Sequence, residues 1–221
     1  MNQDYLSNSL TRECLDNLLR VSQCQEFKQG ETLFLEHSFC ENIYFIINGN
    51  VTLYKDNSDG KRKIIYLLGK DSFLNDTMIY DESQKTSVSC DAFSDVKAMI
   101  VPIKEFKKLI FKHPDLAILI IKSLSKKTKR LYRQLKNTTT ISMDKRIAAK
   151  LWKLAKDFGY EYKEFHGFTV KVNNTYLADM LGTNRETVSR GIKKLKELGL
   201  VKVENGQIFI LKREIREFYR R

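Results

Sequence analysis

The stretch Val172–Arg190, with the sequence VNNTYLADMLGTNRETVSR, decides the predicted fold. Its first half has apolar residues at helical spacing, namely Leu177, Ala178 and Leu181. Asn173 precedes them and is a residue type that caps helix N-termini. Gly182 follows them at the point where a left-handed residue commonly ends a helix. The first half therefore predicts a short helix that ends at a glycine turn.

The second half of the stretch predicts another helix. Thr183 or Asn184 can cap its N-terminus. Its apolar stripe consists of Val188, Ile192 and Leu195. Two short helices joined by a glycine turn, with the small Ala178 where they cross, are typical of a helix-turn-helix.

The polar residues of the second helix indicate what the helix-turn-helix binds. Arg185 and Glu186 lie in the first turn, and Arg190 lies just over one turn later. The N-terminal residues of a recognition helix reach base edges in the major groove. Arginine binds guanine through O6 and N7, and glutamate accepts from N4 of cytosine. We expect further contacts to phosphates or bases from Thr187, Ser189 and Asn173. An ordinary solvated helix start is the alternative.

The motif NRETVSR at Asn184–Arg190, after LADMLG at Leu177–Gly182, resembles the recognition motif of the Crp/Fnr family of bacterial transcription regulators. The resemblance implies a regulator that binds double-stranded DNA sequence-specifically as a homodimer. It also implies a palindromic TGTGA-like operator, with two arginines on guanines and the glutamate on a cytosine. RNA polymerase as a further partner and a role as activator are compatible with the resemblance, but the residues do not separate activation from repression.

The charge of the chain is divided unevenly between its two halves. Residues 1–103 contain 10 Lys and Arg against 15 Asp and Glu, which gives −5, whereas residues 104–221 contain 29 against 12, which gives +17. An acidic half joined to a basic half predicts a polyanion-binding module attached to a module of another kind. Because the helix-turn-helix lies in the basic half, we expect DNA rather than an anionic membrane surface.

The N-terminus MNQDY lacks the basic start and the apolar run of a signal peptide. No stretch approaches the roughly 18 uncharged apolar residues that a membrane-spanning helix needs. We therefore expect a cytoplasmic protein without a membrane partner.

The region between Gly30 and Val101 has the pattern of a β-domain. Short β-rich runs occur at Thr32–Leu35, Ile43–Ile47, Val51–Tyr54, Lys63–Leu68, Val88 and Val96–Val101. Turn residues separate them at Gly30, Asn48-Gly49 and Asp59-Gly60. Regularly spaced hairpins of this kind predict a double-sheet barrel or jelly roll. The order GETLF at Gly30–Phe34 and IYFIINGNV at Ile43–Val51 resembles the cyclic-nucleotide-binding fold.

Proteins with that fold close the barrel around a phosphate cassette with a Gly-Glu pair for the ribose and an Arg followed by Ser or Thr for the cyclic phosphate. Here Asn75 and Asp76 stand where Gly-Glu would be, and Lys85 and Thr86 where Arg-Ser would be. A buried phosphate needs the bidentate arginine and the glycine-exposed amides. We assign these four residues to an effector pocket whose small molecule is not cyclic AMP. A cyclic-nucleotide-responsive or thiol-redox-responsive regulator is the alternative.

A long helix is predicted after His113-Pro114, where the helix that begins at Pro102 must stop. Apolar residues and threonines repeat in it at spacings of four and three. The repeat is an a/d seam of about three heptads, which predicts a parallel coiled-coil dimer. The seam residues are Ile121, Leu124, Thr128, Leu131 and Leu135. Packing of the stripe on its own barrel is the alternative. We expect a hinge at residues 138–142.

Around the helix-turn-helix we expect a helix over residues 145–158, a strand over residues 168–172 and a hairpin over residues 201–211. Residues 1–27 should form one or two short helices. The predicted fold class is α+β, with three parts: an N-terminal double-stranded β-helix or jelly-roll barrel that resembles a cyclic-nucleotide-binding sensor in residues 1–112, a coiled-coil dimerisation helix and hinge in residues 113–142, and a winged helix-turn-helix DNA-binding domain in residues 143–221.

Neither the cysteines nor the histidines form a recognisable sequence motif. The four cysteines, Cys14, Cys24, Cys40 and Cys90, contain no C-x-x-C pair. They also lack the tight N-terminal cluster of the iron–sulfur regulators in the family. We expect reduced thiols, some of them in the core. The three histidines, His37, His113 and His166, match no catalytic or metal-ligand spacing, so we expect surface or capping roles. The sequence predicts no metal, no cofactor and no enzymatic activity.

Overall fold

A computed structural model of the chain describes residues 4–220, apart from the side chains of residues 138–140. The described residues form two compact units. The first unit contains residues 4–55 and 65–131, and the second contains residues 56–64 and 132–220. Within the described part of the chain, no helix is both long and apolar enough to cross a membrane.

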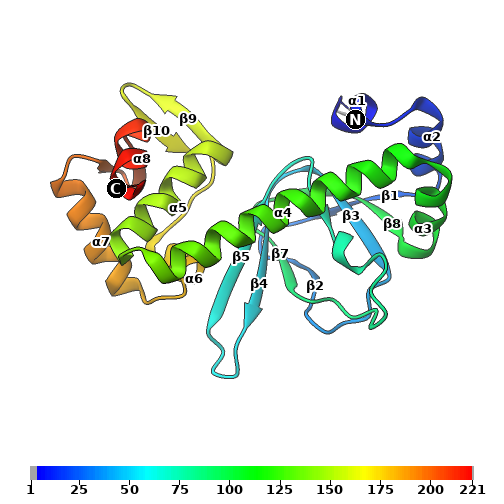
Figure 1. The fold of residues 1–221 in the computed structure, drawn as a ribbon, viewed down its shortest axis with the longest axis horizontal. Helices are drawn as coiled ribbons and strands as arrows, with labels where there is room; N and C mark the ends of the chain where they lie inside the picture. Colours follow the sequence, from blue (N-terminus) through cyan, green and yellow to red (C-terminus); the bar gives the residue numbers. More distant parts are fainter. Residues whose placement is uncertain (1–3, 221) are drawn as a thin grey trace. The chain divides into compact units, whose positions relative to one another are not determined.

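Two four-stranded sheets form the body of the first unit (Figure 1). One sheet has the order β1 (Gln23–Phe27), β8 (Val96–Pro102), β3 (Asn42–Asn48) and β6 (Phe73–Leu74). The other has the order β2 (Thr32–Phe34), β7 (Ser89–Ala92), β4 (Val51–Asp56) and β5 (Arg62–Leu68). Strands distant in the sequence pair within each sheet, as they do in a jelly roll. The predicted barrel is confirmed.

Strand β3 is buried on both faces because it stands between two hydrophobic clusters. Ile43 and Phe45 belong to the cluster that also contains residues of the helices. Tyr44 and Ile46 point the other way, into the cluster between the two sheets. Alternation at period two therefore lets one strand contribute to both cores, which explains its almost continuous apolar sequence.

The turn between β3 and β4 requires glycine. Gly49 has a φ of +86°, a left-handed value that side chains rarely adopt. A Cβ atom at this position would also lie 2.1 Å from the carbonyl oxygen of Asp95. The close approach joins this turn to the one before β8, where Ser94 Oγ accepts from the amide of Asn50 at 3.0 Å. The glycine thus serves both the local turn and a tertiary contact.

Helices α1 (Asp4–Ser9), α2 (Arg12–Arg20) and α3 (Ile103–Lys112) belong to the first unit, together with most of α4 (Pro114–Thr140). They bury Leu18, Phe106 and Leu116 against the sheet that contains β3. The short N-terminal helices are as predicted, but the end of the region predicted as helical is strand β1. Four of its five residues are exposed, and its whole length pairs with β8. This ladder is a tertiary contact that no local pattern signals.

The second unit is a winged helix (Figure 1). Its helices are α5 (Met143–Phe158), α6 (Asn174–Leu181), α7 (Arg185–Glu197) and α8 (Lys212–Arg220). Its sheet has the order β11 (Val201–Glu204), β12 (Gln207–Ile210), β10 (Phe165–Phe168) and β9 (Gly159–Tyr162). The wing hairpin turns at Asn205 and Gly206, with φ values of 49° and 74°. Positive φ at both turn residues is why Asn-Gly predicted this hairpin correctly.

The strand predicted over residues 168–172 is wrong in its bounds. β10 ends at Phe168, where it pairs with the first residue of β9. Val170 and Val172 are 4 % and 8 % exposed, so their apolar character reflects burial of the connection to α6 rather than a strand. The helix predicted over residues 145–158 is confirmed as α5. Strand β9 and helix α8 have no counterpart among the elements predicted from the sequence.

Candidate functional site

The helix-turn-helix forms with the caps that its residues indicate. Asn173 Oδ1 accepts from the amide of Tyr176 at 2.8 Å and caps α6. Gly182 ends α6 in the left-handed region, with φ 65° and ψ 50°. Asn184, rather than Thr183, caps α7 and accepts from the amide of Thr187 at 2.8 Å. Each cap satisfies a backbone donor that the helix itself leaves unpaired.

Helix α7 has one apolar and one polar face. Its stripe of Val188, Ile192 and Leu195 is buried, as predicted. The opposite face presents four exposed residues of the predicted set: Arg185, Glu186, Ser189 and Arg190. Thr187 is half-buried, and its Oγ1 accepts from Arg190 Nη2 at 3.4 Å. The structure therefore gathers the predicted base-reading residues on one solvent-facing surface, which we call the reading face.

Asn173 lies at the other end of the motif, before α6. Its side chain is exposed, but its oxygen is engaged in the α6 cap. The cap uses the side-chain oxygen and not the amide nitrogen. A contact from this side chain to a phosphate would therefore be made by the nitrogen. The contact to DNA stays a prediction.

Residues of α5 hold the helix-turn-helix in place, and the sequence analysis missed them. Arg146 Nη2 donates to the carbonyl of Leu181 at 2.6 Å, at the end of α6. Asp144 accepts from Lys194 of α7. Gly191 lets α7 approach α5 closely, because a Cβ atom there would lie 2.3 Å from Ile147 Cδ1. Glycine inside a helix was the one sequence signal that could have indicated this contact.

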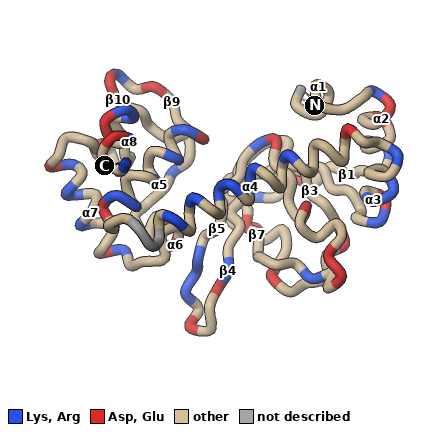
Figure 2. Tube along the Cα trace, viewed as in Figure 1, with Lys and Arg blue, Asp and Glu red and all other residues tan. Residues whose placement is uncertain are grey.

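Further basic residues lie in α7 and in strand β11. Lys193 and Lys196 are exposed. Lys194 pairs with Asp144, and Lys202 lies 2.5 Å from Glu204. Helix α7, which contains Lys193, Lys194 and Lys196, has more basic than acidic positions (Figure 2), and Lys202 belongs to β11. Two of the four lysines are thus already engaged in ion pairs within the unit.

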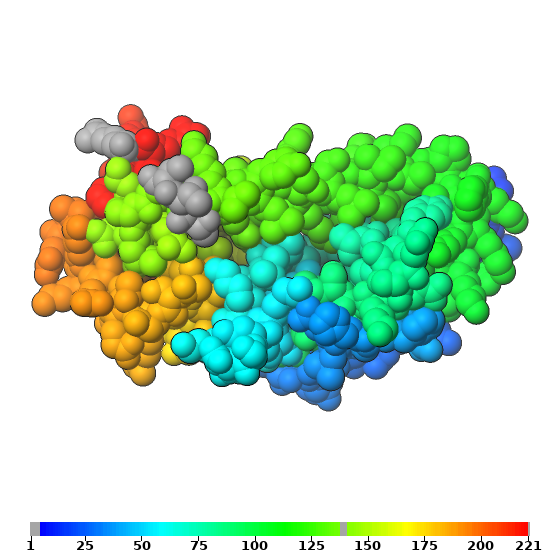
Figure 3. Space-filling view, turned by 60° about the horizontal axis from the view of Figure 1, so that its bottom comes forward, coloured from blue at the N-terminus to red at the C-terminus, as the bar shows by residue number. Residues whose placement is uncertain are grey.

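Helix α4 has two apolar faces. The inner face buries Leu116, Leu119 and Ile120 in the core of the first unit, and Leu124 packs against the same cluster. The outer face leaves large apolar side chains in solvent. These are Ile118, Ile121, Leu131, Tyr132 and Leu135, which are 44–69 % exposed. Atoms of this segment lie at the surface along much of the view in Figure 3.

The predicted seam therefore divides between these two faces. Ile121, Leu131 and Leu135 are exposed, as a dimer seam requires, and so is Thr128. Leu124 belongs instead with the chain's own core. Ile118 and Tyr132, which were not predicted, lie on the outer face. The heptad pattern could not separate the faces because an inner stripe and an outer stripe on one helix share similar spacings. The side chains of residues 138–140, in the predicted hinge, lie outside the described residues, and the helix there ends at Thr140.

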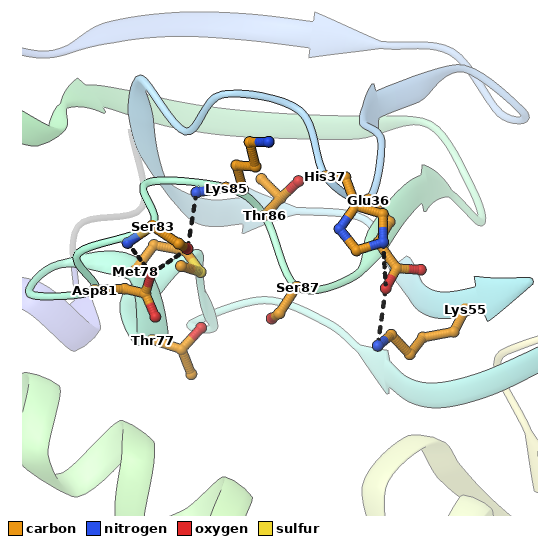
Figure 4. Close-up of a pocket in the computed structure, with 10 residues that line it drawn as sticks. All are labelled: Glu36, His37, Lys55, Thr77, Met78, Asp81, Ser83, Lys85, Thr86 and Ser87. Carbon is orange, nitrogen blue, oxygen red and sulfur yellow. Dashed lines mark hydrogen bonds and ion pairs between the residues drawn. The ribbon is translucent and has the colours of Figure 1, made fainter.

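A cavity of about 490 Å³ lies in the first unit beside the segment that contains the predicted effector residues. It is lined by Glu36, His37, Lys55, Thr77, Met78, Asp81, Ser83, Lys85, Thr86 and Ser87. Figure 4 shows Asp81, Ser83 and Thr77 on one side, and Glu36 with Lys55 on the other. Lys55 Nζ lies 2.8 Å from Glu36 Oε1, so this cation is already paired. Ser83 holds the pKa of the Asp81 carboxyl below its usual value through hydrogen bonds.

The residues predicted to bind a phosphate are poorly placed for that role. Thr86 is 1 % exposed, and its hydroxyl donates to the carbonyl of Leu35 at 2.5 Å. Lys85 is exposed, and its side chain points away from Thr77 and Ser87 in Figure 4. The cavity therefore offers neither a free hydroxyl from the threonine nor a cation directed inward from the lysine.

Asn75 and Asp76 are turned toward the inside of the unit. Asn75 has a left-handed φ of 61°, and its Nδ2 donates to the carbonyl of Asn42 at 3.2 Å. The Asp76 side chain is 2 % exposed and lies 2.5 Å from Lys127 Nζ. Its other oxygen accepts from Ser123 Oγ at 2.7 Å. Both partners are on α4, so Asp76 ties the short helix η1 (Asp76–Met78) to the long helix.

Lys127 completes this buried network. Its ammonium group also donates to the carbonyl of Phe73 at 2.7 Å. Burial lowers the pKa of Lys127, and the charge of Asp76 and the hydrogen bond to it oppose that shift. Lys127 lies outside the predicted a/d seam, so the heptad pattern does not indicate its burial. No sequence signal marks its partner, because the two residues are far apart in the chain and meet only in the fold.

The cysteines and histidines differ from the sequence-based expectation in part. Three thiols are buried, and burial raises the pKa of Cys14 to about 12 and that of Cys90 well above its ordinary value. Cys24 is exposed. His37 is exposed, but His113 is 7 % exposed, and the Nδ1 atom of His166 is buried without a hydrogen-bond partner among the described residues. His166 is half-buried in strand β10, so it is neither a helix cap nor a fully exposed surface residue. His113 does cap α3, but from a buried position.

Comparison with known families agrees with the two units. A model of the cyclic nucleotide-binding domain matches residues 24–113, and a model of the Crp-like helix-turn-helix domain matches residues 145–215. A sensor-type barrel followed by a winged helix with an exposed recognition helix defines a class of DNA-binding transcription regulators. The chain belongs to the Crp/Fnr family of these regulators.

Relatives match over nearly their whole length. The cAMP-activated global transcriptional regulator CRP of Pasteurella multocida is 26 % identical over 192 residues, which cover 86 % of this chain and 91 % of that protein. The protein of the same name from Haemophilus influenzae is 24 % identical over 196 residues, or 89 % and 87 % of the two chains. The solved structure of the c-di-GMP responsive global regulator CLP from Xanthomonas campestris has a TM-score of 0.80 at 19 % identity, over 90 % and 99 %. That likeness shows the fold alone.

Proposed function

We propose that this protein binds a palindromic, TGTGA-like DNA operator as a homodimer in the cytoplasm and responds to a small molecule other than cyclic AMP. The reading face of α7 is the observation that carries the proposal. It combines two exposed arginines and an exposed glutamate at the start of a well-capped helix. RNA polymerase would be a further partner if the protein activates transcription.

Base reading follows from the chemistry of these side chains. Arg185 and Arg190 each offer a planar fork that matches O6 and N7 of guanine. Glu186 accepts from the exocyclic amine of cytosine and disfavours other bases at that position. The caps at Asn173 and Asn184 fix the helix ends, so the side chains project from a rigid element. Lys193 and Lys196 supply attraction to phosphates, which does not depend on sequence.

A homodimer is supported by the outer face of α4. Several large apolar residues of this face are exposed in the single chain, in a stripe along the helix. An apolar stripe of this length is typical of a surface that another chain covers. A parallel pair of these helices would give two reading faces related by a two-fold axis, which matches a palindromic operator.

A signal other than cyclic AMP is supported by the contacts around the cavity. Thr86 and Asp76, which stand at phosphate- and ribose-binding positions by resemblance, are both engaged inside the protein. The acidic Asp81 lines the cavity and would repel a phosphate, whereas Lys55 is paired with Glu36. The named relatives respond to different nucleotides, cAMP in one case and c-di-GMP in another, so the fold does not fix the ligand.

The experiment that tests the proposal is fluorescence anisotropy of the purified, reduced protein on a TGTGA-type palindrome and on a scrambled duplex. We expect tighter binding to the palindrome at about 0.15 M salt, where non-specific binding is weak. A selection from a random duplex library, run in parallel, reports the preferred half-site directly. Recovery of an unrelated half-site would refute the TGTGA preference, and recovery of no sequence with or without cell extract would refute the reading role of α7.

A further inference from the structure

The structure brings together three metal-ligating side chains that the sequence leaves far apart. Cys14 lies in the first turn of α2, whereas His113 and Asp115 lie at the junction of α3 and α4. One ligand atom from each residue lies within 4.8 Å of the other two. Cys14 is 0 % and His113 is 7 % exposed, while Asp115 is partly open to solvent. The cluster belongs to the first unit, apart from both the reading face and the cavity.

The donor set indicates one class of ion. A thiolate, an imidazole and a carboxylate together suit Zn²⁺ and similar first-row cations, whereas Mg²⁺ and Ca²⁺ prefer oxygen ligands alone. The charges also match, because one thiolate and one carboxylate balance a divalent cation. Binding would release the Cys14 proton to solvent, since only the thiolate is a ligand. In zinc proteins three protein ligands commonly leave the fourth position to water, and the exposed side at Asp115 admits one.

We propose that Cys14, His113 and Asp115 form a binding site for a divalent transition-metal ion of the zinc class. The site goes beyond the proposed DNA-binding function and does not depend on it. Zinc-class bonds of 2.0–2.3 Å place the ligand atoms of a tetrahedral site roughly 3.5 Å apart. The three ligand atoms here lie within 4.8 Å of one another, so small side-chain rotations can bring them to that separation.

The contacts around the cluster leave the necessary atoms available. Thr11 donates to Asp115 from its amide at 2.6 Å and from its hydroxyl at 3.0 Å, and both bonds end on Oδ2. The other carboxylate oxygen can therefore face the ion while Thr11 keeps the first one in place. Asn17 Nδ2 lies 3.2 Å from His113 Nε2. With the amide turned over, its oxygen would accept from Nε2–H and leave Nδ1 for the metal, which is a common outer-shell arrangement.

The position of the site gives it a structural consequence. It connects α2 to the start of α4, the helix that carries the outer apolar face. Polar contacts already link these segments, because Thr11 at the N-cap of α2 donates to Asp115 and the Asn17 amide nitrogen lies 3.2 Å from His113 Nε2. A metal ion would add a bond to Cys14 and fix the two helices more firmly. We therefore expect the bound ion to raise the thermal stability of the first unit.

Cobalt(II) titration of the full-length protein tests the site, because thiolate-to-cobalt charge transfer produces an absorption band that other ligands do not. Cys24 is exposed and could bind metal on its own, so Cys24→Ser is the starting protein. We expect one cobalt ion per chain with the charge-transfer band, and displacement of the cobalt by Zn²⁺. Adding Cys14→Ser should remove the band. Asp115→Asn, which keeps an oxygen for Thr11, should weaken binding by roughly tenfold or more.

Circular dichroism of each variant confirms that the fold is retained. If the Cys24→Ser protein shows no charge-transfer band, or if Cys14→Ser leaves the band unchanged in a folded protein, the proposed site is overturned. If Asp115→Asn binds cobalt as tightly as the Cys24→Ser protein does, the three-ligand set is also overturned. These outcomes are independent of operator binding, so failure of the DNA-binding proposal would leave this test intact.

Discussion

The reading face on α7 and the cavity in the barrel differ in how their side chains are used. On α7, Arg185, Glu186 and Arg190 project into solvent, and caps and buried apolar residues hold the helix itself. Around the cavity, Thr86 and Asp76 are engaged by the protein's own carbonyl and ammonium groups. The reading face has hydrogen-bonding groups available to a partner. Around the cavity, the hydrogen-bonding groups of Thr86 and Asp76 are bonded within the protein. The reading face is therefore open to a partner, whereas these two residues near the cavity are held within the first unit.

The buried ion pair Asp76–Lys127 is the clearest case of side chains engaged within the protein. Breaking it should have the largest effect on stability among the changes considered. Lys127→Met would leave the Asp76 carboxylate buried without its cation. We expect a loss of roughly 3–5 kcal/mol in the free energy of unfolding, as for other broken buried pairs. Urea denaturation of the purified variant measures it.

Two further variants separate the pair from the lysine alone. Lys126→Met changes an exposed lysine of the same helix and should have little effect. The double variant Asp76→Leu/Lys127→Met removes both charges and should recover most of the stability. If Lys127→Met is as stable as Lys126→Met, the pair does not hold η1 to α4.

The next largest effect should come from changes to the outer face of α4, which links the two reading faces in the proposed dimer. Ile121→Glu/Leu131→Glu places charges on two residues that are 60 % and 44 % exposed in the single chain. We expect a folded monomer, and a loss of operator affinity on the order of a hundredfold, because the two half-sites are no longer linked. Analytical ultracentrifugation and anisotropy measure the two consequences. Phe111→Glu, at an exposed apolar residue of α3, is the control and should remain dimeric.

Removal of one base-reading side chain should have a smaller and sequence-dependent effect. Arg185→Ala should weaken operator binding by roughly 1–3 kcal/mol and relax the preference at one base pair. Lys193→Ala, on the same helix, should weaken every duplex alike and lower the salt slope by about one. Anisotropy on the operator and on single-base variants distinguishes the two. An equal loss from Arg185→Ala on all duplexes would contradict its reading role.

The smallest effect should be that of added cyclic AMP on the thermal stability of the protein. A ligand present at a hundred times its Kd adds about 2.7 kcal/mol to the stability of the folded state. We expect no measurable rise in Tm at millimolar cyclic AMP, because the groups that would hold its phosphate and ribose are engaged within the protein. Differential scanning fluorimetry measures this. A clear rise, together with tighter operator binding, would show that the cavity rearranges to accept the nucleotide.

The sequence determined those parts of the protein whose causes are local. Asn184, Gly182 and the apolar stripe of α7 act within a few residues of one another, so helix, turn and reading face could be predicted together. Asn205-Gly206 likewise predicted the wing, because its positive φ values are a property of the two residues themselves. The resemblance to the Crp/Fnr family rested on the helix-turn-helix stretch together with the β-rich runs at Gly30–Phe34 and Ile43–Val51.

The tertiary structure decided whatever depends on partners distant in the chain. Asp76 was assigned to the cavity by its place in a motif, but its burial depends on Lys127 and Ser123 of α4. Leu124 fitted the predicted seam, but it packs against the hydrophobic core beneath α4. Cys14 and His113 had no metal-ligand spacing, and only the packing of α2 against the α3–α4 junction brings them together. Spacing along a chain reports neighbours within one helix or turn, whereas these contacts arise from how separate elements pack.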